Sequence, residues 1–536
     1  MNPLPSFPDI SAVPAGGATI GGGPAGGFSI SGGVGSISYV LTEIEGASAG
    51  LQRIAEQLWA ISRGVEDALI FLDAAVFGVS SYPFQALERL RSAARGCREC
   101  HAAVQEIATE AATAAARYRQ TEADNARFLA AQRSAVAYTS GLQLRLGAPL
   151  AAPLAAPLVA LWQLATLAEG ARVHGVRDAA EDLVNNAPEY LAGLLGLPYG
   201  MASMLTRQRN QGGLASGPFG ENAAAGLRRF LTDSGAFLPG ELDVVRLQPS
   251  AWNPAQLAGH TVLADGSVLG SMEPTLHDLF AGSKDAYTVA PAAIVLKRIE
   301  RGSAGPAWIV DLPGTEVWNP LDSNNPWDLE GDLEAMTSSR RTDFGRQQVM
   351  VEEWVKAALR DAGALPSAPV MINGHSGGGI QAAAMAADPA FLAEVDVRII
   401  NLAGAPAANQ NVAPGIKVLD LQNIDDVVPA ADLAKPPDSG DWVTATSGRR
   451  TATGTLQAAE QGSVLGRAHS LDGYLQDASW LDKTGDVSIL AHKQAVLGFL
   501  GTAALTGTVS YRKYVYQGSD RNRTANVSGG RSGRGR

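Results

Sequence analysis

The sequence is poor in cysteine, in charged side chains and in aromatic side chains. Its 536 residues include two cysteines, 18% charged residues and 6% aromatic residues. Two cysteines cannot build a disulfide framework, and a net charge of −11 spread along the chain offers no basic surface for nucleic acid. Residues 1–20 lack a basic segment followed by an apolar one, so we expect no conventional secretory signal.

Long apolar runs are also scarce, and a single segment requires a membrane test. Leu146–Ala168 carries no formal charge and is long enough to span a bilayer. Pro149, Pro153 and Pro157 interrupt it, however, and each removes a backbone donor that lipid cannot replace. We therefore expect a proline-punctuated connector that at most contacts a membrane and does not cross it.

Changes in composition divide the chain into five segments. Residues 1–36 are rich in Gly and Pro without apolar periodicity, and we expect them to be disordered. Residues 37–140 predict a long antiparallel helical hairpin, and 141–240 a helical connector. Residues 241–515 predict an α/β domain, and 516–536 a basic disordered tail whose arginines are expected to aid solubility.

Two apolar seams predict the hairpin, because their members recur at intervals of three and four residues. The first seam comprises Leu41, Ile44, Ala47, Leu51, Ile54, Leu58, Ile61, Val65 and Leu69. The second comprises Leu87, Leu90, Cys97, Cys100, Val104, Ile107, Ala111, Ala114 and Tyr118. Gly78, Ser80, Ser81 and Pro83 break the pattern between them, which indicates two long helices joined by a short turn.

Short β-branched runs alternate with helix-like segments in the second half of the chain. The predicted strands are residues 292–297, 307–311, 370–373, 397–402 and 416–421. This alternation is typical of a mostly parallel sheet wrapped by helices.

A candidate nucleophile follows one of these strands. Gly374-His375-Ser376-Gly377-Gly378 fits the pattern G-x-S-x-G, with an apolar strand before it and a helix-forming run after it. Small residues at Gly374 and Gly378 let the backbone of such a sharp turn pass close to its neighbours. Gly46–Gly50 fits the same pattern around Ser48, but it lies inside a predicted helix, and we interpret it as accidental.

A serine nucleophile requires a base and an orienting carboxylate, which are expected in the chain order Ser, Asp, His. Asp426 follows a predicted strand and is our choice, with its neighbour Asp425 as the alternative. His469 lies in a loop before the last helices and is our choice of base. His492 is the alternative, but we expect it on the polar face of a helix. His375 is expected to pack beneath the site.

An oxyanion site is expected from backbone N–H groups. Gly377 begins the helix after Ser376, so its N–H and the helix dipole point toward the site. Gly314 or Thr315, in the turn after residues 307–311, is the candidate for the second donor. Trp318 and Trp327 lie in the following loop, which is expected to line a substrate pocket or to act as a lid, with packing of the two tryptophans in the core as the alternative.

With Gly-His-Ser-Gly-Gly, Asp-Val-Val-Pro and His-Ser-Leu-Asp-Gly-Tyr in this order, residues 285–500 resemble α/β-hydrolase esterases and lipases. Asp426–Pro429 is similar to the acid turn of class 3 lipases and related actinobacterial hydrolases. The resemblance implies an α/β-hydrolase fold and hydrolysis of an acyl or lipid ester through an acyl-enzyme, without a cofactor. The same triad also serves other acyl transfers, so the natural ester stays open.

The hairpin resembles, in outline, the WXG-type helical modules of type VII secretion substrates. Tyr118-Arg-Gln-Thr-Glu122 matches their Tyr-x-x-x-Asp/Glu export motif, although Phe77-Gly78 stands where the family has Trp-x-Gly. The resemblance implies a type VII secretion partner and export by that route. The alternative is an adaptor or dimerisation hairpin in a cytoplasmic protein.

Cys97-Arg-Glu-Cys100-His101 matches the attachment pattern of c-type haem, but we expect no haem there. Both cysteines fall on the apolar seam of a predicted helix, where small apolar side chains are expected. A zinc site would need a fourth ligand that the hairpin does not offer, so we expect no metal.

Overall fold

The computed structural model describes residues 27–75, 84–147, 219–237, 240–318, 324–344, 349–432, 434, 436–449 and 467–522. The chain divides into two compact units, residues 37–134 and the remaining residues. Most of the predicted connector lies outside the described residues, including nearly all of Leu146–Ala168. Within the described residues, no helix is long and apolar enough to cross a membrane.

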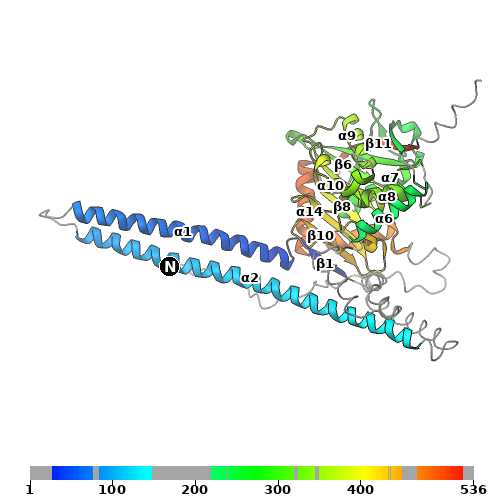
Figure 1. Ribbon diagram of the computed structural model, residues 1–536. Helices are drawn as coiled ribbons and strands as arrows, with labels where there is room; N and C mark the ends of the chain where they lie inside the picture. The colour runs from blue at the N-terminus through cyan, green and yellow to red at the C-terminus, as the bar shows by residue number, and fades with distance from the viewer. Residues whose placement is uncertain are drawn as a thin grey trace, which may run out of the picture. The chain divides into compact units, whose positions relative to one another are not determined.

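The predicted helical hairpin is present. Helix α1 spans Ile37–Ala75 and α2 spans Phe84–Gly147 (Figure 1). Two serine hydroxyls of α1 donate hydrogen bonds to backbone carbonyls of α2: Ser48 Oγ to Ala108 O over 2.7 Å, and Ser62 Oγ to Ala94 O over 3.1 Å. Ser48, which fits the nucleophile pattern, therefore has a structural role between two helices.

The helices meet along small residues, and the predicted seams of α1 and α2 are both wrong in part. Every seventh residue is buried or half-buried at the contact: Leu41, Ser48, Ala55, Ser62 and Leu69 from α1, and Leu87, Ala94, His101, Ala108 and Ala115 from α2. Ala47, Ile54 and Ile61 of α1 were expected there, but all three are exposed. Leu90, Cys100, Ile107 and Ala114, expected on the seam of α2, are also exposed. Small side chains and hydroxyl-to-carbonyl bonds at these positions outweigh the greater hydrophobicity of isoleucine.

The other unit is built on an eleven-stranded mixed sheet with the order β1-β10-β9-β8-β7-β6-β5-β11-β4-β3, in which β2 also pairs with β11. The five strands from β10 to β6 are mutually parallel, and the remaining pairs are antiparallel. All five predicted strands are present. The strands are β1 Phe28–Gly32, β2 Gly240–Leu247, β3 Thr261–Val262, β4 Val268–Met272, β5 Ala293–Glu300, β6 Pro306–Leu312, β7 Pro369–His375, β8 Asp396–Ala403, β9 Lys417–Asn423, β10 Trp442–Ser447 and β11 Val509–Asn522.

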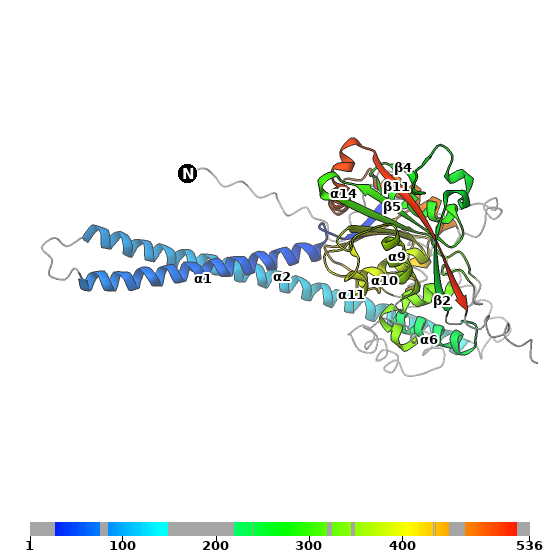
Figure 2. The ribbon, with the colours of Figure 1, turned by 90° about the horizontal axis from the view of Figure 1, so that it is seen from above.

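Helices cover both faces of this sheet (Figures 1 and 2). They are α6 Phe219–Asp233, α7 Leu276–Val289, α8 Leu329–Met336, α9 Met350–Asp361, α10 Gly377–Ala387, α11 Pro389–Leu392, α13 Leu471–Leu481 and α14 Val487–Leu500. One buried cluster joins α9 and α10 to the sheet, and the other joins α7, α13 and α14. Adjacent strand residues contribute to opposite clusters, as with Val310 and Ile309, because side chains alternate between the faces of a sheet.

Two predicted disordered segments contribute strands. Residues 28–32 of the expected N-terminal disordered segment form β1, which pairs with β10 at the edge of the sheet. Residues 516–522 of the expected tail belong to β11, whose long course beside β5, β4 and β2 is visible in Figure 2. Both boundaries were wrong because pairing with distant strands orders segments that are too short to be ordered alone.

Candidate active site

Ser376 lies in a sharp turn between β7 and α10. Its backbone has φ 53° and ψ −122°, and among the described residues only Ala292 is another non-glycine with positive φ. A Cβ atom at Gly374 would lie 2.4 Å from the carbonyl carbon of Gly378, and one at Gly378 would lie 2.0 Å from Pro313 O. Both glycines are therefore required by close backbone contacts, as predicted, and they leave Ser376 in a strained conformation.

The three residues predicted as a triad form one hydrogen-bonded chain. His469 Nε2 lies 2.8 Å from Ser376 Oγ, and His469 Nδ1 lies 2.8 Å from Asp426 Oδ2. Asp426 comes from the turn after β9, and His469 lies just before α13. The contact with Asp426 places the imidazole proton on Nδ1, so that Nε2 is free to accept the proton of the Ser376 hydroxyl.

Asp426 has further partners that fix its carboxylate. Tyr474 donates its hydroxyl proton to Asp426 Oδ2 over 2.6 Å, and the Val428 N–H donates to Oδ1 over 3.0 Å. Burial, together with the charge of Asp426, raises the pKa of Tyr474 well above its ordinary value, so Tyr474 stays a donor. Asp425, the alternative, is buried beside it, with its N–H bonded to Asn423.

His492, the alternative base, does not face Ser376. It lies in α14, where it is buried and bonded through Nε2 to Asn401 Oδ1 over 2.8 Å. The expectation that it occupies a polar helix face is therefore wrong. Burial lowers the pKa of His492 to about 3, so it is neutral in the core.

His375 links the elbow to the base. Its Nε2 donates to the backbone carbonyl of His469 over 3.0 Å, and its Nδ1 accepts from the Tyr287 hydroxyl over 3.0 Å. The His375 and His469 rings lie 4.9 Å apart between centroids. Burial, aided by the neighbouring His469, lowers the pKa of His375 to about 3, so it remains the neutral tautomer that these bonds require.

The structure brings together Gly314, Thr315 and Gly377, the residues expected to supply oxyanion donors. A Cβ at Gly314 would lie 2.9 Å from Ser376 Cβ, and one at Gly377 would lie 2.8 Å from Thr315 Oγ1. Within the described residues, the N–H groups of Thr315 and Gly377 have no hydrogen-bond partner. The Gly314 backbone lies close to the Tyr287 hydroxyl, where its N–H partly offsets the rise that burial causes in the phenol pKa.

A buried acid supports this turn. Asp332 in α8 accepts a hydrogen bond from Thr315 Oγ1 over 2.7 Å, and a Cβ at Gly377 would lie 2.3 Å from its Oδ1. Burial raises the pKa of Asp332 to about 7, although the bond from Thr315 opposes the change. The carboxyl group therefore titrates close to neutral pH.

The two tryptophans expected near the substrate differ in their exposure to solvent. Trp318 is 60% exposed, at the edge of residues 319–323, which lie outside the described chain. Trp327 is 1% exposed and packs against Trp354, with ring centroids 5.6 Å apart. The core-packing alternative therefore holds for Trp327, because its ring completes the cluster beneath α9.

Sequence reasoning missed Asp332 and Tyr287 and gave no role to Tyr474. Tyr474 stands in the quoted His-Ser-Leu-Asp-Gly-Tyr motif, so its spacing from His469 was a usable signal. Asp332 and Tyr287 lie on helices far away in the chain, and nothing in their local sequence distinguishes them. In the described residues, no group of His, Cys, Asp and Glu could hold a metal ion, and His101 bonds to Ala55 O over 2.9 Å.

No protein-family model matches the chain, and neither the curated proteins nor the solved structures contain a match. The assignment of the site therefore depends on the geometry of its residues.

Proposed function

We propose that the protein is a serine hydrolase of α/β-hydrolase type that cleaves carboxylic esters, including acyl or lipid esters, through an acyl-enzyme. The observation that carries the proposal is the bonded chain Ser376–His469–Asp426, with the serine on a strained strand-to-helix turn. The resemblance to class 3 lipases supports the same activity. This chemistry requires no cofactor.

In the proposed reaction, Ser376 Oγ attacks the ester carbonyl while its proton passes to His469 Nε2. Asp426 holds the imidazole tautomer and stabilises the imidazolium that forms. His469 then gives this proton to the departing alcohol, which leaves the acyl group on Ser376. A water molecule, deprotonated by His469, releases the acid and restores the serine.

The N–H groups of Gly377 and Thr315 are the proposed oxyanion donors, since neither has another partner in the described structure. Of the two alternatives in this turn, Thr315 is preferred because its side chain, bonded to Asp332, lies next to Gly377. The bond from Thr315 to Asp332 keeps the turn against Gly377.

Hydrolysis of p-nitrophenyl acetate, butyrate and palmitate by wild type and Ser376→Ala tests the proposal. We expect the variant to lose several powers of ten in kcat/KM. Labelling by a fluorophosphonate reports an activated serine independently. The proposal would be contradicted if the wild-type protein neither hydrolysed these esters nor was labelled at Ser376. The sheet unit would then serve as a scaffold without catalytic activity.

A second candidate function is binding of a helical partner by the hairpin, such as the type VII secretion machinery. It is supported by the row of exposed apolar side chains Val40, Ile54 and Ile61 along α1. Tyr118 of the export motif lies half-buried on α2. If export follows this route, Tyr118→Ala keeps the protein in the cell pellet while wild type reaches the medium; equal partition of the two proteins counts against it.

A further inference from the structure

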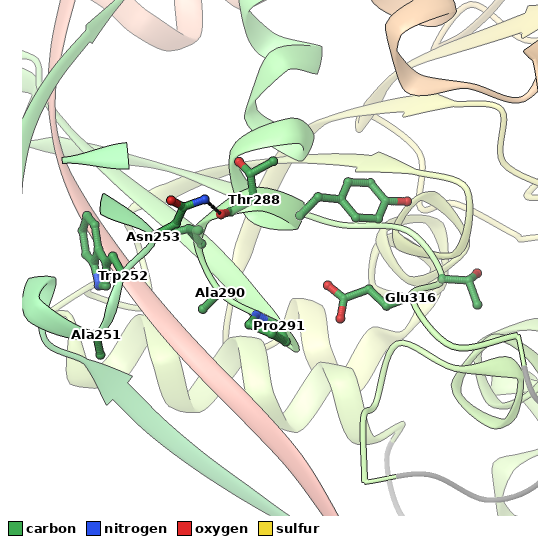
Figure 3. Close-up of a pocket in the computed structure, with 10 residues that line it drawn as sticks. Ala251, Trp252, Asn253, Thr288, Ala290, Pro291 and Glu316 are labelled. Carbon is green, nitrogen blue, oxygen red and sulfur yellow. Dashed lines mark hydrogen bonds between the residues drawn. The ribbon is translucent and has the colours of Figure 1, made fainter. Parts of the chain in front are cut away.

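A cavity of about 700 Å³ opens beside the proposed oxyanion turn (Figure 3). Thr315 forms part of its wall, and so does Tyr287, which bonds to His375. The rest of the wall comes from the segments around Trp252 and Pro291. A substrate whose carbonyl oxygen is bound by the Thr315 N–H would therefore have this cavity next to it.

The charge of the cavity is negative. Glu316 is the one side chain that carries a charge among the ten described residues of its wall, and Figure 3 shows its carboxylate directed toward Ala290 and Pro291. Its Oε2 accepts hydrogen bonds from Ala292 N over 2.9 Å and from Asn325 Nδ2 over 2.7 Å. Both donors are uncharged.

No cation in the described chain neutralises this carboxylate. Glu316 Oε1 is buried without a hydrogen-bond partner there. Lys513, whose ammonium lies 5.7 Å from the Trp252 ring, is paired with Asp285 at 3.7 Å. A negative charge beside the oxyanion turn also opposes the charge that develops on the substrate during attack, so a compensating positive charge would assist the reaction.

The uncompensated negative charge of Glu316 determines whether the cavity binds the acyl half or the alcohol half of an ester more favourably. An aliphatic acyl chain would enclose the charge of Glu316 in apolar surroundings without supplying a counter-charge, which is costly. An ammonium group gains from the carboxylate, and Tyr287 supplies an aromatic ring in the same wall.

We infer that this cavity receives the alcohol half of the substrate and that Glu316 selects an alcohol carrying a quaternary or protonated amine. The inference rests on the proposed esterase function and names its substrate class, an acyl ester of an amino alcohol. Glu316 acts here as a specificity-determining residue, and Ser376, His469 and Asp426 perform the chemistry.

Choline butyrate and 3,3-dimethylbutyl butyrate test the inference, because their alcohols share one shape and differ in charge. We expect wild type to favour the choline ester about tenfold in kcat/KM, the ratio that one charge contact of modest strength provides. Glu316→Gln should bring the ratio close to one. Its Oε1 can still accept from Ala292 and Asn325, so the wall keeps its bonds while the charge is lost.

The kcat/KM ratio of the two esters is measured separately for each protein. A general loss of activity in Glu316→Gln lowers both values equally and does not change this ratio. Glu300→Gln, which removes an equal charge at the far end of β5, is the matched control and should keep the wild-type ratio. Raising the salt concentration should reduce the preference in wild type.

Equal rates on the two esters in wild type would overturn the inference, as would a preference that survives in Glu316→Gln. A stronger preference for glycerol monobutyrate than for the choline ester would also overturn it, in favour of a hydroxyl-bearing alcohol. Hydrolysis of p-nitrophenyl butyrate and labelling of Ser376 report the proposed function separately. Both persist if only the inference about the cavity fails.

Discussion

His375 donates a hydrogen bond from Nε2 to the backbone carbonyl of His469 over 3.0 Å. The residue before the proposed nucleophile thus holds the backbone of the proposed base. Tyr287 bonds to the other ring nitrogen of His375 and also contacts Gly314, so one buried imidazole connects the elbow, the base and the oxyanion turn.

His375→Phe should therefore lower kcat about tenfold and change KM little, because His469 loses an anchor while the cavity keeps its wall. The loss corresponds to about 1.4 kcal/mol, near the value of one buried hydrogen bond. His375→Gln retains an N–H donor and should recover part of the rate. Steady-state kinetics on p-nitrophenyl butyrate check this; equal rates for the Phe variant and wild type would exclude a positioning role.

Substitution can show which of Asp426 and Asp425 orients His469. Asp426→Asn should reduce kcat about 10⁴-fold, because the amide no longer stabilises the correct tautomer of His469. Tyr474→Phe removes one donor to Asp426 and should cost about tenfold. Asp425→Asn, the adjacent control, should stay within a few-fold of wild type in the same assay. A loss that is greater for Asp425→Asn than for Asp426→Asn would reassign the acid.

Five of the eleven strands and the three residues of the proposed triad could be predicted because their signals are local. An apolar run between turns identifies β7, and a nucleophile must follow such a strand directly. The order of Asp426 and His469 along the chain then limited the choice to two residues at each position. Spatial contact, which local sequence does not encode, separated Asp426 from Asp425 and His469 from His492.

The missed features depend on contacts between distant segments. Asp332 supports the turn at Thr315 from a helix whose sequence marks no site. Residues 28–32 are too short to be ordered alone, and they form a strand because β10 offers an edge more than 400 residues along the chain. In α1, a hydrophobicity pattern ranks Ile54 above Ala55, whereas close approach of the two helices favours the smaller side chain.

The small-residue seam predicts a specific sensitivity of the hairpin. Ala108→Leu places a large side chain where Ser48 bonds to the Ala108 carbonyl, and should destabilise the hairpin by about 1–3 kcal/mol. Hydrogen exchange of the amides of α1 and α2 should accelerate about tenfold or more as a result. Ala103→Leu, an exposed position on the same helix, is the control and should change exchange little. Equal effects of the two substitutions would contradict the proposed contact.

Asp332 makes stability depend on pH in a direction opposite to that of most carboxylates. Its pKa rises from 3.8 when unfolded to about 7 when folded, because burial disfavours the charge. Its contribution to stability is therefore complete below about pH 4 and is lost as the pH rises through 7.

Asp332→Asn cannot titrate, and its amide oxygen can still accept the bond from Thr315. The free energy of unfolding of wild type relative to this variant should fall by up to ~4 kcal/mol between pH 4 and pH 8. Urea unfolding, followed by the fluorescence of the buried tryptophans of the sheet unit, measures this difference at each pH. Because groups that titrate in both proteins cancel, a difference that stays constant from pH 4 to pH 8 would mean that Asp332 is ionised throughout, and its support of Thr315 would then be that of a buried carboxylate.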